Sequence, residues 1–136
     1  MVRNVRFINP QPIAKPRGYT HVVEITGPGR TVYIAGQLGL DRDGKIVGAP
    51  GDFRAQAVQA FENLKAALAA ADATFRDVVK INSYVVGMNH LAAFREVRDT
   101  YLNMAAPPAS TLVGISQLAR EGALFEIEAV AMLPPK

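Results

Sequence analysis

The residues best suited to chemistry in this sequence are two glutamates near its C-terminus. Glu126 and Glu128 stand two positions apart within the apolar run 123–130. Residues two apart in a β-strand point to the same face, so the two carboxylates share one side of a predicted strand. A carboxylate in such a strand is costly unless it is solvated or paired. The two glutamates therefore mark either an exposed or ion-paired strand face, or a cleft in which a carboxylate moves a proton or holds a water molecule.

Two further segments offer groups to a ligand. Ser110 and Thr111 stand where the turn 106–111 leads into a predicted strand. Their hydroxyls could hydrogen-bond a ligand or simply cap the turn. Gly36 follows another predicted strand, where a glycine either lets a ligand approach the backbone or marks a bulge. The sequence shows no Ser-His-acid arrangement and no glycine-rich phosphate loop.

The composition of the chain removes several classes of site. There is no cysteine, which excludes a disulfide scaffold, a thiolate zinc site and a cysteine nucleophile. The two histidines, His21 and His90, stand far apart, so no metal site is expected. The net charge of +3 falls short of the clustered basic stripe typical of nucleic-acid binding. No signal peptide or membrane span is recognisable, so we expect a cytoplasmic protein without a membrane partner.

Periodicity predicts one domain over residues 1–136 with two helices. The first helix spans 52–71, with Asp52 as N-cap and an apolar stripe made of Ala57, Phe61, Leu64 and Leu68. The second helix starts near Asn89 or His90, runs to about Leu102, and turns inward Leu91, Phe94, Val97 and Tyr101.

Strands are predicted at 5–8, 21–25, 31–35, 78–86, 111–115 and 124–132. The segment 26–30 indicates a hairpin between the second and third strands, and the turn 41–44 leads into a short extended run at 45–47. The order β-β-β-α-β-α-β-β is typical of an α+β domain with two helices packed on one face of a sheet. Apolar residues on both faces of strand 31–35 favour self-association through the other face.

Several of these segments together resemble the Rid family, also called YjgF and often described as endoribonuclease L-PSP. The matching segments, in chain order, are Gly18-Tyr19-Thr20-His21, Val32-Tyr33-Ile34-Ala35-Gly36-Gln37-Leu38, Ala60-Phe61-Glu62-Asn63-Leu64-Lys65, Asp77-Val78-Val79-Lys80 and Phe125-Glu126-Ile127-Glu128-Ala129-Val130-Ala131. The resemblance implies a chorismate-mutase-like fold with a mixed sheet, a homotrimer, and small-molecule sites in the clefts between subunits. It also implies hydrolysis of reactive enamines and imines such as 2-aminoacrylate, without a metal or an organic cofactor.

The resemblance carries three site residues onto this chain. Tyr19 matches a tyrosine that lines the family's cleft, and Gly36 matches a glycine whose backbone meets the ligand. Glu126 matches the glutamate that positions the attacking water and moves the proton.

The family's carboxylate-binding arginine has no counterpart at its usual place. In the segment Pro108-Ala109-Ser110-Thr111, Ser110 stands where the family has that arginine, and Arg95 stands where many members carry a cleft asparagine. Losing a charged partner of a buried carboxylate costs about 2–5 kcal/mol. We therefore expect an arginine-lacking member that is not an efficient 2-aminoacrylate deaminase. Its ligand would be neutral, larger, or held by the hydroxyls of Ser110 and Thr111.

Three functions follow from these observations. The first is hydrolysis of an imine, an enamine or a related small metabolite, with Glu126 as the catalytic residue. The second is a non-catalytic trimer that binds a small molecule for regulation. The third is RNA cleavage that inhibits translation, for which the sequence supplies no histidine pair or metal cluster.

Overall fold

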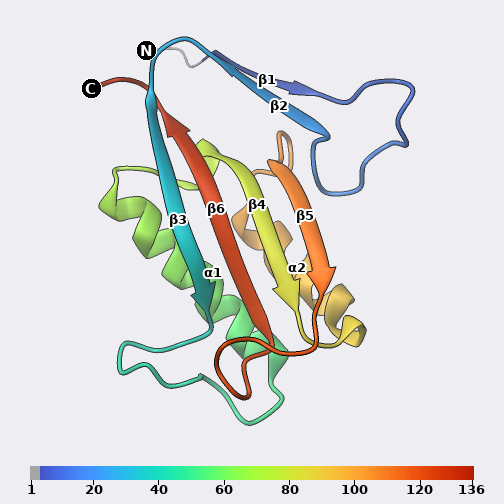
Figure 1. Ribbon diagram of the computed structural model, residues 1–136, viewed down its shortest axis with the longest axis vertical. Helices are drawn as coiled ribbons and strands as arrows, with labels where there is room; N and C mark the ends of the chain where they lie inside the picture. The colour runs from blue at the N-terminus through green and yellow to red at the C-terminus, as the bar shows by residue number, and fades with distance from the viewer. Residues whose placement is uncertain (1–3) are drawn as a thin grey trace.

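A four-stranded mixed sheet in the order β3-β6-β4-β5 carries the helices on one of its faces (Figure 1). The computed structural model describes residues 4–136. Its strands are β1 (Asn4–Ile8), β2 (Val22–Thr26), β3 (Arg30–Leu38), β4 (Val78–Val85), β5 (Ala109–Gly114) and β6 (Phe125–Leu133). Its helices are α1 (Phe53–Ala70) and α2 (Leu91–Tyr101), with short 3₁₀ turns at Phe75–Asp77 and Met88–His90. This order confirms the predicted α+β architecture.

Helix α1 forms where its apolar stripe and its N-cap predict. Asp52 caps the helix, because its Oδ1 accepts a hydrogen bond from the Ala55 backbone N–H at 3.0 Å. The predicted stripe is wholly buried against the sheet: Ala57, Phe61, Leu64 and Leu68. Helix α2 buries Phe94 and Val97 in the same way. Within residues 4–136, neither helix has the length and apolar character needed to cross a membrane.

The centre of the core is a group of aromatic rings around Phe125 of β6. The Phe125 ring lies 5.9 Å from that of Phe61, 5.7 Å from that of Phe53 and 5.6 Å from that of Phe94. The first two partners belong to α1 and the third to α2. Phe125 thus joins both helices to the central strand and is fully buried.

Strand β6 runs antiparallel to both of its neighbours, β3 and β4. Strands β4 and β5 are parallel, and α2 supplies the crossover that a parallel pair requires. β5 therefore forms one edge of the sheet and β3 forms the other (Figure 1).

The predicted hairpin between the second and third strands is wrong. β2 pairs with β1, from Asn4↔Thr26 to Ile8↔Val22, in a separate two-stranded sheet. β3 instead pairs along its length with β6. Gly27, at φ +82°, still turns the chain, but the turn redirects it from one sheet to the other (Figure 1).

The segment after β3 is a loop rather than a strand. The turn at 41–44 is present, with the Gly44 N–H bonded to the Asp41 carbonyl at 3.0 Å. The run 45–47 contributes only an isolated bridge between Leu40 and Ile46.

Candidate functional site

The two glutamates of β6 lie on the sheet face opposite the helices, as the alternation predicts. Phe125, Ile127 and Ala129 are buried under α1 and α2, whereas Glu126 and Glu128 are half-buried on the open face. The period of two in a strand enforces this division. The open face therefore presents two carboxylates from a single strand.

Glu126 lies directly against Gly36 of the neighbouring strand. The register between β3 and β6 shifts between Ile34 and Gln37, which marks a bulge next to the glycine. A Cβ added at Gly36 would lie only 2.0 Å from Oε2 of Glu126 and 2.7 Å from its Cδ. The glycine is therefore needed for space, because the carboxylate occupies the position of a side chain. The structure brings these two predicted residues together.

Tyr84 of β4 is a site residue that the sequence analysis did not identify. It is the register partner of Glu126, and its hydroxyl donates a hydrogen bond to Oε1 of Glu128 at 2.8 Å. That hydrogen bond, followed by burial and by the charges of Glu128 and Glu126, raises the pKa of Tyr84. Alternation along the predicted strand 78–86 puts Tyr84 on one face with Lys80 and Asn82, and this was the available signal.

Thr111 also lies on the open face, at the edge strand. Its register partner is Asn82, whose partner on the other side is Glu128. The Thr111 hydroxyl accepts a hydrogen bond from Nζ of Lys80 at 3.3 Å. A row of polar groups thus crosses β6, β4 and β5 beside the glutamates.

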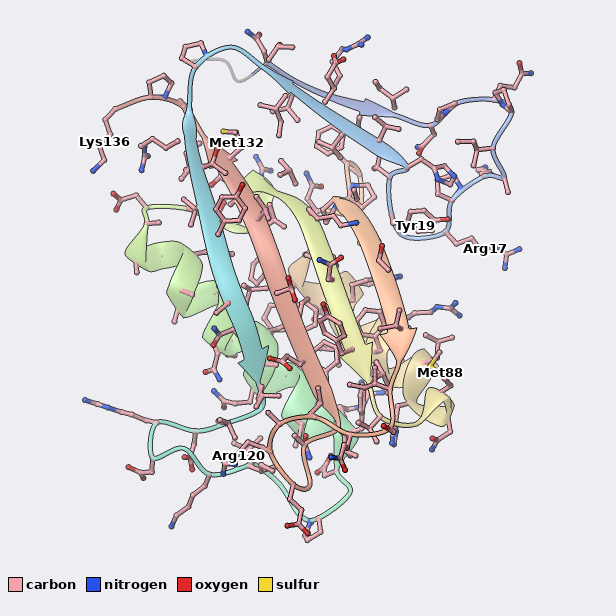
Figure 2. The ribbon with its side chains drawn as sticks, viewed as in Figure 1. Arg17, Tyr19, Met88, Arg120, Met132 and Lys136 are labelled. Carbon is pink, nitrogen blue, oxygen red and sulfur yellow. The ribbon has the colours of Figure 1, made fainter. Side chains whose placement is uncertain are left out.

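Ser110 faces the opposite way from Thr111, because adjacent strand residues alternate. It lines a cavity of about 200 Å³ between β5, α2 and the N-terminal loop. Two other predicted residues, Tyr19 and Arg95, line the same cavity. Figure 2 shows Tyr19 beside the start of β5 and Met88 beside its end.

Thr20 holds the N-terminal loop against the entrance to β5. Its backbone N–H bonds the carbonyl of Pro108 at 3.2 Å, and its hydroxyl bonds the carbonyl of Pro107 at 2.6 Å. Thr20 is buried, so these contacts fix the position of the adjacent Tyr19. The Tyr19 ring also meets His21 edge-on, at 5.2 Å between ring centroids.

The predicted site residues therefore fall into two groups within one chain. Gly36, Glu126 and Thr111 lie on the open face, and the other three, Tyr19, Arg95 and Ser110, line the cavity behind β5. A more open hollow of about 660 Å³ lies between the N-terminal loop and residues 104–107, and of the predicted site residues it contains only Tyr19. Within residues 4–136, no three His, Cys, Asp or Glu side chains come together as metal ligands.

Comparison with known proteins gives the class to which this fold and site belong. Residues 10–133 match the family model described as endoribonuclease L-PSP. A crystal structure of a conserved Rid family protein, YyfB from Yersinia pestis, superposes with a TM-score of 0.81 at 38% identity, over 96% of this chain and 99% of that one. The chain belongs to the Rid family.

Relatives with named activities are also similar over most of their length. A 2-iminobutanoate/2-iminopropanoate deaminase of Dermatophagoides farinae is 35% identical over 125 residues, which cover 91% of this chain and 90% of the relative. A protein of the same name from Mus musculus is 36% identical, over 86% of this chain and 82% of the relative. RidA from an Antarctic Psychrobacter species has a TM-score of 0.70 at 35% identity, over 88% and 92% of the two chains.

The contact between Gly36 and Glu126 predicts energetic coupling between the two positions. Gly36→Ala should displace the carboxylate and destabilise the wild-type chain relative to the same change in a Glu126→Ala background. We expect a coupling of about 0.5–3 kcal/mol, which is typical of side chains in contact. The loss of backbone freedom on replacing glycine is common to both backgrounds and cancels. Denaturant unfolding of the four proteins measures the coupling, with a Glu128→Ala background as the additive control. Equal costs of Gly36→Ala in the wild-type and Glu126→Ala backgrounds would contradict the contact.

The raised pKa of Tyr84 predicts a stability change in alkali. The group ionises at a higher pH in the folded protein than the ordinary value of 10.0, so its contribution is fully present below pH 10 and is lost as the pH rises through the folded pKa. The unfolding free energy of the wild type should therefore fall more steeply above pH 10 than that of Tyr84→Phe. Tyr101, whose pKa burial and Glu62 raise to about 12, is present in both proteins and cancels. Parallel curves for wild type and Tyr84→Phe would refute the assignment.

Proposed function

We propose that this protein hydrolyses small 2-imino compounds and their enamine tautomers, with Glu126 as the catalytic acid and base. The observation that carries the proposal is the Glu126 carboxylate, held against the Gly36 backbone on an open, polar sheet face. The two relatives named as 2-iminobutanoate/2-iminopropanoate deaminases support the reaction type.

The reaction assigns a simple task to the carboxylate. Glu126 accepts a proton from a water molecule as the water oxygen bonds to the imine carbon. Glu126 then delivers that proton to nitrogen, which completes a carbinolamine. It next takes the hydroxyl proton of the carbinolamine and passes it to the amine nitrogen, so that the C=O bond forms, the C–N bond breaks and ammonia leaves. One water is consumed and one keto compound is formed. The bare backbone at Gly36 lets the ligand approach the carboxylate closely.

The division of the site residues favours a ring of identical subunits. Two different surfaces of the chain, the open face with Glu126 and the β5 edge with Tyr19 and Ser110, each carry half of the set. Contact between two different surfaces is heterologous, and a heterologous contact gives a ring where its rotation closes and an open filament where it does not. We propose a homotrimer in which the open face of one subunit meets the cavity of its neighbour.

A second candidate function is binding without turnover. Ser110 and Leu112, and no arginine, are the β5 residues that line the cavity. On this basis we propose that 2-aminoacrylate is a poor substrate, and the non-catalytic trimer is the alternative if no imine is hydrolysed at all.

Glu126→Gln should reduce imine hydrolysis by at least about 100-fold, because general acid–base catalysis contributes roughly that much or more. The measurement is ammonia release from a panel of imines, 2-iminobutanoate among them, generated in place by an amino-acid oxidase. Glu62→Gln on α1, which keeps an oxygen acceptor for the Tyr101 hydroxyl, is the matched control and should retain activity. Unchanged turnover in Glu126→Gln would remove Glu126 from the mechanism. Ligand-induced thermal shifts without any turnover would select the binding function.

The assembly predicts a native mass three times the 14.6 kDa of one chain. Tyr33 on the open face is 80% exposed in the isolated chain, so Tyr33→Glu should place an unpaired carboxylate in the interface and dissociate the ring. Light scattering coupled to size-exclusion chromatography measures both masses. Val58→Glu on α1, at a residue 39% exposed, is the control and should remain trimeric. A monomeric wild type would refute the assembly.

A further inference from the structure

The cavity behind β5 carries an unusual excess of positive charge. Arg17, Arg95 and Arg98 all line it, and no acidic residue does. Its remaining walls are Ser110, Tyr19 and apolar side chains from α2, β5 and Met88. At about 200 Å³ it lies below the range of about 300–1,000 Å³ for drug-sized ligands. A small anionic metabolite fits this size and charge.

Arg98 is the most enclosed of the three cations, with only 11% of its side chain exposed. Its Nε donates a hydrogen bond to Oδ1 of Asp99 at 2.9 Å, and its guanidinium lies 5.6 Å from the ring centre of Phe94. Gly18 makes room for it, since a Cβ there would lie 2.4 Å from Nη2. The guanidinium is therefore held in place on three sides.

The terminal nitrogens of Arg98 remain available to a ligand. Nη1 and Nη2 make no hydrogen bond within the described part of the chain. Both nitrogens keep contact with solvent, because Ser83 Oγ is the only fully buried and unpaired polar side-chain atom among the described residues. An anion in the cavity would therefore gain charge-assisted hydrogen bonds from them. Two adjacent terminal nitrogens match the two oxygens of a carboxylate.

Arg17 and Arg95 stand at the rim of the same cavity. Both side chains are exposed, and neither forms an ion pair within residues 4–136. Arg17 projects from the N-terminal loop, close to Tyr19 (Figure 2). Asp99 offsets part of the Arg98 charge, but within residues 4–136 no acidic side chain lines the cavity itself. The cavity therefore complements a ligand with more than one negative charge.

We propose that this cavity binds the acidic end of the substrate, that Arg98 holds a carboxylate there, and that the three arginines select a small 2-imino dicarboxylate over a 2-imino monocarboxylate. This inference rests on the proposed imine hydrolysis and names its substrate class. A dicarboxylate also differs from the neutral ligand that Ser110 alone would suggest. Arg95 and Arg98 of α2 and Arg17 of the N-terminal loop supply the positive charge that β5 does not.

Comparison of two matched substrates tests the selectivity for a dicarboxylate over a monocarboxylate. An amino-acid oxidase generates the imines of glutamate and of 2-aminobutanoate, and ammonia release gives kcat/KM for each. We expect a preference of about tenfold or more for the dicarboxylate. Its rate should also fall more steeply with added salt, because screening weakens attraction to exposed charges. A preference for the monocarboxylate, with turnover present, overturns this inference and leaves the proposed function standing.

Arginine variants separate the role of the enclosed Arg98 from the roles of Arg17 and Arg95 at the rim of the cavity. Arg98→Gln should lower kcat/KM for both imines by about 30-fold or more, as expected when an enclosed charge partner is lost. Arg17→Gln and Arg95→Gln should each lower only the dicarboxylate rate, by about twofold to fivefold. Arg54→Gln, at an exposed arginine paired with Glu96 on the helices, is the control. Arg17 is on an exposed loop, so its variant keeps the test open if Arg98→Gln does not fold.

Binding measurements test the anion selectivity of the cavity independently of turnover. Calorimetric titration with 2-oxoglutarate, 2-oxobutanoate and inorganic phosphate compares a dicarboxylate, a monocarboxylate and a second kind of dianion. Tightest binding of 2-oxoglutarate, weakened in Arg98→Gln, supports the inference even if no imine is hydrolysed. Equal affinities for the two oxo acids, tighter phosphate binding, or no effect of Arg98→Gln overturns it.

Discussion

Phe125 packs against rings from α1 and α2 at once, and this contact fixes the rotation of β6 about its own axis. A strand has two faces, so burying Phe125 on one of them leaves Glu126 no position except the other. A slip of one residue would bury both carboxylates and expose the aromatic core. The cost of burying a charge therefore secures the register of the strand and the direction of the Glu126 carboxylate.

The same register explains why the neighbouring strands carry their particular residues. β3 approaches Glu126 with Gly36, because a larger residue would occupy the space of the carboxylate. β4 approaches with Tyr84, which satisfies Glu128 with a hydrogen bond and leaves Glu126 as the carboxylate not bound to the tyrosine. The two glutamates of this strand thus have different partners: Glu128 accepts a hydrogen bond from Tyr84, and Glu126 lies against Gly36. Neighbouring strands, rather than β6 itself, make this distinction.

Local patterns in the sequence predicted the elements but not all of their partners. The helix at Phe53–Ala70 and the faces of β6 follow from periods of 3.6 and 2, which any chain segment carries within itself. The failed hairpin shows the limit: Gly27 predicts a turn, but which strand β2 meets depends on residues far away. The hydrogen bond from Tyr84 to Glu128 was missed for the same reason, since it joins two strands. The separation of Ser110 from Thr111 needed only the alternation of a strand, but the predicted strand began just after Ser110 and left it in the turn.

Ser110 and Arg98 approach the same small cavity from different elements, the serine from β5 and the arginine from α2. On α2, Arg98 has Phe94 and Asp99 as neighbours, and Gly18 leaves the space that its guanidinium needs. The serine side chain is short and leaves room in the cavity, and the exposed side chains of Arg17 and Arg95 line the same cavity. The positive charge around this cavity therefore comes from α2 and the N-terminal loop, because no arginine of β5 lines it.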